Sequence, residues 1–249
     1  MFRIIRALVA VAVVSVALAG CGSEEEPDSL LVLAASSLTD TFGAVEAAFE
    51  AANPDVDVEI SVAGSSALSV QIEQGAPADV VALAGMVPMD ALAEAGLVEA
   101  PVRFATNSMV LAVPIDNPGD VDGLDALSDS DLLVGVCAPQ VPCGRYAREV
   151  FDEAGVDASI DTEEPDVRSL AGKIASGELD AGLVYATDVG SMPDRLVAIP
   201  LPDDVDVRAE YPIAIVRDSD DRDGARRFID FVGSPAGQTI LADGGFGGG

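Results

Sequence analysis

A serine pair stands where an expected strand passes into an expected helix. An alternating apolar run over residues 56–62 predicts the strand, and helical spacing over 67–74 predicts the helix that follows Ser65 and Ser66. The first N–H groups of a helix have no partner within it, and the helix dipole adds about half a positive charge there. Such a position binds an anion without a cationic side chain. The alternative is that a serine there only caps its helix.

The same arrangement occurs earlier in the chain. Ser36 and Ser37 lie between an apolar strand pattern at 30–34 and a helix pattern at 38–52. Strand and helix patterns alternate along the whole sequence, which predicts an α/β fold with mainly parallel sheets. Ligands of such folds sit beyond the carboxyl ends of the strands, where these serine turns are expected. The repetition therefore favours an anion-binding site over simple helix caps.

Residue types that are missing exclude most catalytic chemistry. The chain has no histidine and no tryptophan. Without histidine there is no Ser-His-Asp or Cys-His nucleophile system, and the commonest ligand of transition metals is absent. The sequence also contains no Gly-x-Ser-x-Gly elbow, no Ser-x-x-Lys motif and no calcium-binding loop. We therefore expect a binding protein with no catalytic residues, no metal site and no cofactor.

The composition describes a folded and strongly acidic protein. The 249 residues are 49% hydrophobic, with mean hydropathy +0.36, enough for one large or two modest domains. There are 43 acidic and 13 basic residues, for a net charge of −30. Nucleic acid is excluded as a partner because no basic stripe is available to neutralise phosphates. The acids are spread along the chain, as expected for a solvated surface.

The N-terminus has the pattern of an exported lipoprotein. Residues 1–20 predict a signal peptide, with Arg3 and Arg6 before an apolar segment at 7–18. The segment Leu-Ala-Gly-Cys at 18–21 resembles a bacterial lipobox, in which the cysteine is acylated. A transmembrane anchor is the alternative, but the apolar run is short for a membrane span. We expect lipid anchoring through Cys21 and an acidic tether over 21–29.

Two further cysteines stand six positions apart. Cys137 and Cys143 flank a loop that contains Pro139 and Pro142. An exported protein meets an oxidising compartment, which favours a disulfide over a pair of reduced thiols. A metal site is disfavoured because two thiols without histidine do not complete a tetrahedral shell. The disulfide is expected to hold a loop in place more than to stabilise the fold.

Several segments resemble the bacterial molybdate-binding proteins, the solute receptors of molybdate ABC importers. The most specific is Gln-Ile-x-x-Gly-Ala-Pro-Ala-Asp at 71–79, whereas Ala-Ser-Ser-Leu at 35–38 is weak alone. The other segments are Val-Pro-Cys-Gly-Arg-Tyr-Ala at 141–147, Asp-Val-Arg at 166–168, Gly-Leu-Val-Tyr at 182–185 and Glu-Tyr-Pro at 210–212. The likeness covers nearly all of residues 30–247.

The resemblance implies a two-lobed type II periplasmic binding protein fold, with mainly parallel sheets flanked by helices. The ligand would lie in the cleft between the lobes. The first lobe would comprise 30–107 and 213–249, and the second 108–212. The chain would cross between them near 107–109 and 210–212. Closure around the ligand would be a hinge motion.

The resemblance also implies a set of ligand-binding residues, through hydroxyl groups, backbone amides or both: Ser37, Ser65, Cys143, Val167 and Tyr185. Two positions depart from the family pattern, since alanine is usual in place of Cys143 and serine in place of Gly64. Arg168 stays outside this set, because pairing with a nearby acid is the simpler expectation. The residues alone favour a core tyrosine with a satisfied hydroxyl at Tyr185.

The function implied is capture of molybdate, and of tungstate, for delivery to an ABC permease. We expect an extracytoplasmic monomer that is held at the cell membrane by its lipid. Two alternatives remain, a receptor for sulfate or another tetrahedral oxyanion and a surface lipoprotein without a transport role.

Overall fold

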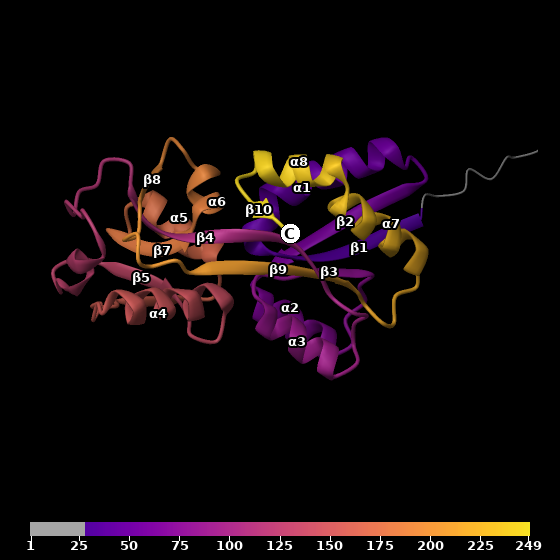
Figure 1. The fold of residues 1–249 in the computed structure, drawn as a ribbon, viewed down its shortest axis with the longest axis horizontal. Coiled ribbons are helices and arrows are strands. Elements are labelled where there is room, and N and C mark those ends of the chain that lie inside the picture. The colour runs from indigo at the N-terminus through magenta and orange to yellow at the C-terminus, as the bar shows by residue number, and fades with distance from the viewer. Residues whose placement is uncertain (1–27) are drawn as a thin grey trace, which may run out of the picture.

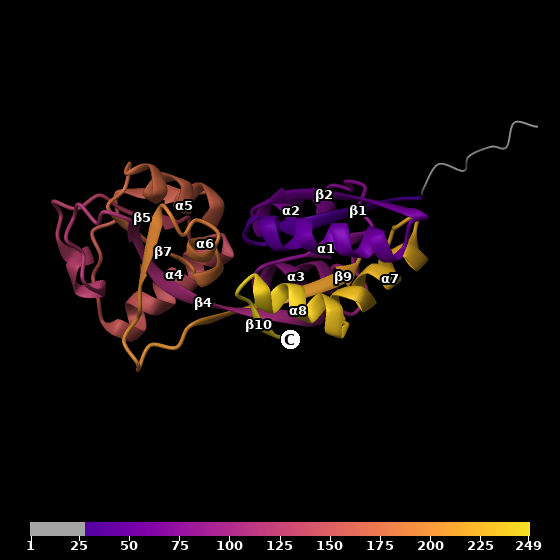
Figure 2. The ribbon, with the colours of Figure 1, turned by 90° about the horizontal axis from the view of Figure 1, so that it is seen from above.

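The computed structural model describes residues 28–249 and has two lobes set side by side (Figure 1). The expected signal peptide, the lipidation site Cys21 and most of the expected tether lie outside the described residues. Within 28–249, no helix combines the length and the apolar character that a membrane span needs. Helices flank a curled sheet, seen from above in Figure 2, which confirms the predicted α/β fold class. The sheet is mixed rather than mainly parallel, since five of the nine strand pairings within 28–249 are antiparallel.

The first lobe is built on strands in the order β2-β1-β3-β9, continuing into β4. β1 pairs in parallel with β2 and β3, and β3 pairs antiparallel with β9. The strands are β1 (Asp28–Ala35), β2 (Val56–Ala63), β3 (Val80–Ala82), β9 (Arg208–Ile215) and the short β10 (Gly247–Gly248). The helices are η1 (Ser36–Leu38), α1 (Thr39–Ala52), α2 (Ser65–Glu73), α3 (Met86–Glu94), α7 (Arg222–Gly233) and α8 (Pro235–Asp243).

The second lobe repeats the alternation of strand and helix. β5 pairs in parallel with β6 and β7, and β4 pairs antiparallel with β7 and β8. The strands are β5 (Val134–Cys137), β6 (Thr162–Glu164), β7 (Ala181–Tyr185) and β8 (Leu196–Ile199). The helices are η2 (Leu124–Ser128), α4 (Pro142–Ala154), α5 (Val167–Ser176) and α6 (Ala186–Gly190).

The long strand β4 (Val102–Pro114) runs through both lobes. Its residues 102–108 pair antiparallel with β9, and its residues 109–114 pair with β7 and β8. Two adjacent antiparallel strands therefore carry the chain between the lobes (Figure 1). The predicted lobe boundaries after 107 and 212 fall inside these two strands and stay predictions.

Apolar side chains between helices and sheet hold the first lobe together. Phe42 and Phe49 of α1 pack edge-on against Phe228 of α7, with ring centroids 6.1 and 5.3 Å apart. Fully burying such a side chain contributes about 1.5–3 kcal/mol. Where the lobes meet, the rings of Tyr185 and Tyr211 are fully buried with centroids 6.1 Å apart. These two tyrosines are thus fixed in position before any ligand is considered.

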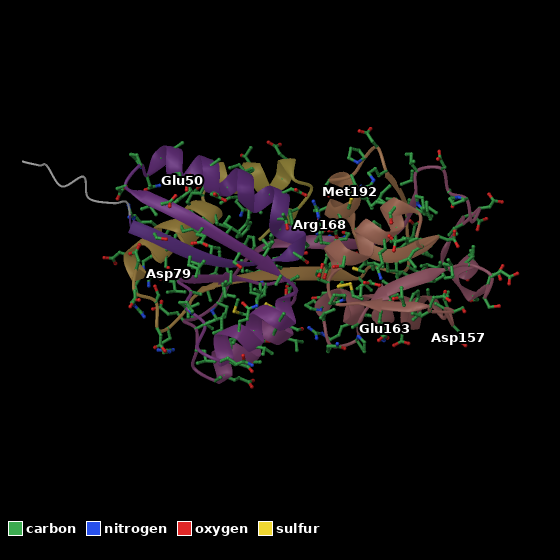
Figure 3. The ribbon with its side chains drawn as sticks, turned by 180° about the vertical axis from the view of Figure 1, so that it is seen from behind. Glu50, Asp79, Asp157, Glu163, Arg168 and Met192 are labelled. Carbon is green, nitrogen blue, oxygen red and sulfur yellow. A yellow bond between two sulfur atoms is a disulfide. The ribbon has the colours of Figure 1, made fainter. Side chains whose placement is uncertain are left out.

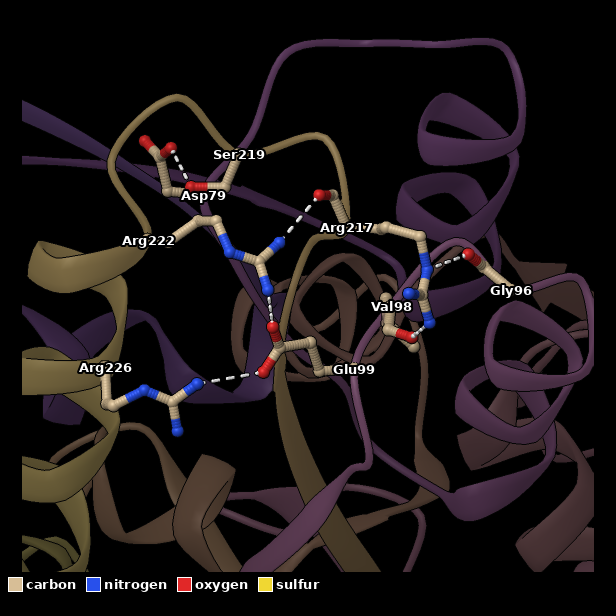
Figure 4. A network of polar contacts seen from close by, with 8 residues as sticks. All are labelled: Asp79, Gly96, Val98, Glu99, Arg217, Ser219, Arg222 and Arg226. Atoms are coloured by element: carbon tan, nitrogen blue, oxygen red, sulfur yellow. Dashed lines mark hydrogen bonds and ion pairs between the residues drawn. The ribbon is translucent and has the colours of Figure 1, made fainter.

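Polar contacts fasten one end of the first lobe (Figure 4). Asp79, the last residue of the Ala-Pro-Ala-Asp motif, accepts hydrogen bonds from Leu31 N (2.9 Å) and Ser219 Oγ (2.6 Å). Nearby, Glu99 pairs with two arginines of α7. The motif that carries most of the resemblance therefore has a structural role, because its aspartate joins β1 to the segment before α7.

Two helices begin earlier than the sequence pattern predicts. α2 starts at Ser65 rather than 67, and α4 starts at Pro142 rather than 145. Proline suits the first helical position, because its φ is already helical and its missing N–H would have no partner there. As a result, Ser65 and Cys143 both lie in first helical turns, where backbone N–H groups lack an intrahelical acceptor.

Candidate functional site

A small cavity lies between the two lobes. Its walls are formed by the carboxyl ends of strands and by the first turns of the helices that follow them. The five residues that the sequence predicts as ligand contacts all line it: Ser37, Ser65, Cys143, Val167 and Tyr185. The structure thus brings the predicted positions of both lobes to one place.

The first lobe contributes two hydroxyl groups to the cavity. Ser65 is buried, and its Oγ accepts a hydrogen bond from the backbone N–H of Ala84 at 2.9 Å. Ser37 Oγ lies 2.9 Å from the hydroxyl of Tyr211. Each serine oxygen is therefore held from behind by another polar group, and the hydroxyl of Ser65 keeps its proton for the cavity.

The second lobe contributes the starts of two helices. Cys143 lies in the first turn of α4, and Val167 is the first residue of α5. The carboxylate of the N-cap residue Asp166 accepts from Ser169 N at 2.9 Å, so this acid caps its own helix. The N–H groups of these first turns remain available to an anion in the cavity.

A disulfide adjoins this wall of the cavity. Cys137 at the end of β5 is bonded to Cys143, and both residues are buried. Because the bond joins the strand end to the first turn of α4, it holds the backbone N–H of Cys143 in place. The sulfur atoms are used by the bond, so only the backbone of Cys143 is available as a donor.

The hydroxyl of Tyr185 is buried and has no hydrogen-bond partner among the described residues. Burial raises the pKa of this hydroxyl well above its ordinary value, so it stays protonated and can donate. Leaving a buried polar group without a partner costs about 1–3 kcal/mol. The alternative of a core tyrosine with a satisfied hydroxyl is therefore wrong, and the group is free to bond a ligand.

No cationic side chain lines the cavity. Its twelve lining residues include no arginine or lysine, and Asp166 is the only acidic residue among them. The donors that face the space are hydroxyl and backbone N–H groups. The arrangement can hold a small anion through uncharged hydrogen-bond donors alone.

Comparison with known proteins agrees with this geometry. The family model for bacterial extracellular solute-binding proteins matches residues 30–247. The molybdate-binding protein ModA of Mycobacterium bovis is 37% identical over 226 residues, covering 90% of this chain and 87% of its own.

The chain belongs to the bacterial extracellular solute-binding proteins.

The resemblance to the molybdate-binding proteins of this family is confirmed. Among solved structures, the periplasmic molybdate-binding protein of Azotobacter vinelandii matches with TM-score 0.76 and 21% identity, over 87% of this chain and 98% of that one. The sulfate-binding protein SubI of Mycobacterium tuberculosis also matches with TM-score 0.76 and 20% identity, over 88% of this chain and 86% of that one. These likenesses show the type II periplasmic binding protein fold. Proteins of this family act outside the cytoplasm, and the family is one of solute-binding proteins rather than of enzymes.

A buried acid supports Tyr185 from behind. Asp188 on α6 accepts a hydrogen bond from Tyr185 N at 3.1 Å and is only 2% exposed. Burial raises the pKa of Asp188 to about 7, although the Tyr185 N–H and the nearby Arg168 act in the opposite direction. The same carboxyl lines a larger cavity that shares Ser37 with the site.

Two contacts outside the small cavity join the lobes. Arg168 at the start of α5 lies where that helix faces the first lobe (Figure 3) and pairs with Asp40 of α1 at 2.8 Å. Both side chains are partly exposed, and Arg168 does not line the cavity. Ser66 Oγ also donates to the carbonyl of Gln140 at 2.8 Å. The described conformation is therefore a closed one.

The family departure at Gly64 has a structural reason. A Cβ atom at this position would lie 2.9 Å from the carbonyl oxygen of Pro165 and 3.3 Å from Cβ of Asp166. Both neighbours belong to the opposite lobe, at the start of α5. The closed form of this chain therefore brings the lobes closer here than a larger residue would allow without a shift.

Sequence patterns did not identify the residues behind the cavity walls. Tyr211 belongs to a family segment and Asn107 to an expected crossing between the lobes, but no pattern gives either of them, or Asp188, a place at the site. Asp188 carries a local signal, because it stands three residues after Tyr185, at the third position of α6, where an acid can accept from the backbone N–H that precedes the helix. Within the described residues, no group of histidine, cysteine or acidic side chains is arranged to hold a metal ion.

Proposed function

We propose that this protein binds molybdate, and tungstate with it, in the cavity between the lobes, and that it passes the anion to the permease of an ABC importer. Molybdate is a tetrahedral dianion with four oxygens that accept hydrogen bonds. The observation that carries the proposal is the buried Tyr185 hydroxyl, which has no protein partner and faces a cavity lined by uncharged donors. ModA proteins of similar sequence support the choice of anion.

Uncharged donors are sufficient for such a ligand. Burying a bare dianion is very costly unless it is densely hydrogen-bonded. Each hydrogen bond to a charged acceptor contributes about 1.5–3 kcal/mol, and five residues from two lobes offer donors here. The same set explains selectivity, because monoprotonated phosphate brings a proton that a cage of donors cannot accept.

The anchoring part of the proposal concerns the N-terminus. Acylation of Cys21 would hold the receptor at the outer face of the cell membrane, and the acidic tether would let it reach its permease. Loss of membrane fractionation in a Cys21→Ser variant would support this part. An unchanged membrane fraction would contradict it. We expect the mature chain to be a monomer and to have no catalytic activity.

Calorimetric titration of the mature chain, beginning at Cys21, tests which anion the protein binds. Molybdate and tungstate should bind tightly with one site per chain, whereas sulfate and phosphate should bind far more weakly. Tight binding of sulfate with weak binding of molybdate would assign the protein to the sulfate receptors instead. Absence of heat and of any ligand-dependent rise in melting temperature with all four anions would support a surface lipoprotein without a transport role.

A further inference from the structure

Two buried residues lie behind the hydroxyl of Ser37. The Tyr211 hydroxyl is 2.9 Å from Ser37 Oγ, and Asn107 Nδ2 is 3.5 Å from the Tyr211 hydroxyl. Asn107 Nδ2 also donates to Thr187 Oγ1 at 2.8 Å. Tyr211 and Asn107 are 0% and 3% exposed, so water does not compete for these contacts. Neither residue lines the small cavity, and the ligand contacts do not explain them.

The direction of these hydrogen bonds matters because Ser37 and Tyr211 have one hydroxyl proton each. If Ser37 donates to Tyr211, a lone pair of Ser37 faces the anion and repels it. If Tyr211 donates to Ser37, the proton of Ser37 is left for the cavity. Burial raises the pKa of Tyr211 far above its usual range, so its proton is retained.

The amide of Asn107 selects the second arrangement. Its Nδ2 hydrogens are directed at the oxygens of Thr187 and Tyr211, and its Oδ1 has no partner among the described residues. An amide hydrogen on the Tyr211 oxygen leaves the Tyr211 proton to be donated, and Ser37 Oγ is the acceptor within reach. In this arrangement the bonds run from Asn107 to Tyr211 and from Tyr211 to Ser37.

Ser65, the second serine of the same wall, also accepts a hydrogen bond from behind, and here the donor is a backbone N–H. The N–H of Ala84 can only donate, and it occupies an acceptor position of Ser65 Oγ. The Ser65 proton cannot point back toward Ala84. Both hydroxyls of this wall are thus backed by a donor, one from the backbone and one from a side chain.

We propose that Tyr211, oriented by Asn107, is a positioning residue that makes Ser37 a donor toward the cavity and so excludes oxyanions that carry a proton. This inference rests on the proposed function, since it concerns how that site distinguishes its ligands. It predicts that discrimination depends on Tyr211 although Tyr211 does not touch the anion.

Selenate and hydrogen arsenate form a matched pair of probes. Both are tetrahedral dianions of similar size, but hydrogen arsenate has one proton that needs an acceptor. In a Tyr211→Phe variant the Ser37 hydroxyl can rotate and accept that proton. The ratio of the hydrogen arsenate Kd to the selenate Kd, from competition against molybdate, should fall about tenfold, as expected for one hydrogen bond.

A Tyr146→Phe variant is the matched control. The ring of Tyr146 packs on Tyr185 with centroids 6.5 Å apart, but Tyr146 does not line the cavity or contact Ser37. It should keep the wild-type ratio. A Tyr211→Phe protein that binds molybdate and also keeps the wild-type ratio would overturn the role of Tyr211.

An Asn107→Asp variant tests the same inference without removing the tyrosine. A carboxylate of the same shape can only accept, so Tyr211 would donate to it and Ser37 would donate to Tyr211. The added charge repels both probes alike, and the ratio should again fall about tenfold. This variant also decides the matter if Tyr211→Phe fails to fold. If the wild-type protein does not bind molybdate, the proposed function and this inference both fail, whereas an unchanged ratio in variants that bind molybdate refutes the inference alone.

Discussion

The two walls of the cavity offer hydrogen bonds in different ways. The first lobe offers the hydroxyls of Ser37 and Ser65, each bonded to a protein group behind it. The second lobe offers backbone N–H groups at two helix starts and the hydroxyl of Tyr185, which has no protein partner. Each hydroxyl of the first wall therefore already has one protein partner, whereas the hydroxyl of Tyr185 has none.

Because of this difference, substitutions in the first wall should change both the stability of the protein and its affinity for the anion, whereas loss of the Tyr185 hydroxyl should change the affinity alone. Removing a side chain from the first wall breaks a protein hydrogen bond as well as a proposed ligand contact. Removing the hydroxyl of Tyr185 takes away a proposed ligand contact alone. Backbone donors of the second wall are not deleted by any substitution except proline, so other changes at Cys143 act only through the position of the chain.

The largest expected effect concerns Asp188, the acid that supports the second wall. Its folded pKa of about 7 lies above the ordinary value of 3.8, so the ionised form is disfavoured in the folded state. Stability is fully present below pH about 4 and is lost as the pH rises to about 7, by up to about 4 kcal/mol. An Asp188→Asn variant keeps an acceptor for Tyr185 N and should melt higher than wild type at pH 8 but not at pH 4.

The control for Asp188 is Asp243→Asn, the same change on an exposed side chain at the edge of the neighbouring cavity. Its melting temperature should differ from wild type equally at both pH values. An equal shift for Asp188→Asn at both values would show that this acid is not destabilising when ionised.

Ser65→Ala breaks the first wall. It removes a donor to the anion, which should weaken molybdate binding about ten- to a hundredfold. It also leaves the buried N–H of Ala84 without its acceptor, which should lower the free energy of unfolding by about 1–3 kcal/mol. Ser66→Ala, whose hydroxyl bonds to Gln140 outside the cavity, should cost less than about fivefold in affinity. Unchanged unliganded stability in Ser65→Ala would contradict the support assigned to Ala84.

Tyr185→Phe sharpens the contrast between the walls. Calorimetry should show molybdate binding weakened about ten- to a hundredfold, because one hydrogen bond to a charge is lost. The melting temperature of the unliganded protein should not fall, since this hydroxyl has no partner in the described residues. A loss of unliganded stability like that of Ser65→Ala would remove the distinction between the walls.

Replacing both Cys137 and Cys143 with alanine tests the backbone donor. The free energy of unfolding should fall by about 2 kcal/mol, as expected for a short disulfide loop. Affinity should change less than about threefold, because the N–H of residue 143 remains. Wild type treated with a reductant gives the same comparison without substitution. A much larger loss of affinity would mean that the disulfide, more than the helix start, sets the position of this donor.

The smallest effect is expected for the ion pair between Asp40 and Arg168, which joins the walls from outside the cavity. Both side chains are partly exposed, so the pair contributes about 0–1 kcal/mol. Asp40→Asn should raise the dissociation rate of molybdate by about two- to fivefold, measured by stopped flow. The difference from wild type should shrink as salt is added, because exposed charges are screened. A difference that does not respond to salt would contradict an electrostatic role.

Local patterns account for the parts of this site that lie at helix starts. Ser37 and Ser65 stand at strand-to-helix turns that the sequence shows directly, whereas Cys143, Val167 and Tyr185 are given by the family resemblance. Their convergence on one cavity agrees with the two-lobed fold that was predicted. That they hold an anion stays a prediction.

The supporting residues could not be predicted in this way. Ser37 and Tyr211 are 174 positions apart, and no local spacing relates residues that meet only through the fold. In the strand β4, polar residues at 106–108 interrupt the apolar pattern, so that the pattern alone indicates a strand only beyond them. In the structure that stretch pairs with β9, and the ladder of hydrogen bonds, rather than apolar burial, keeps it extended.

The paired strands β4 and β9 also restrict how the receptor can open. Single-chain linkers would let each lobe swivel freely, but a two-stranded ribbon flexes far more easily out of its own plane than within it. Opening and closing should therefore follow one path. Donors contributed by distant parts of the polypeptide would then return to the same mutual positions each time the lobes close.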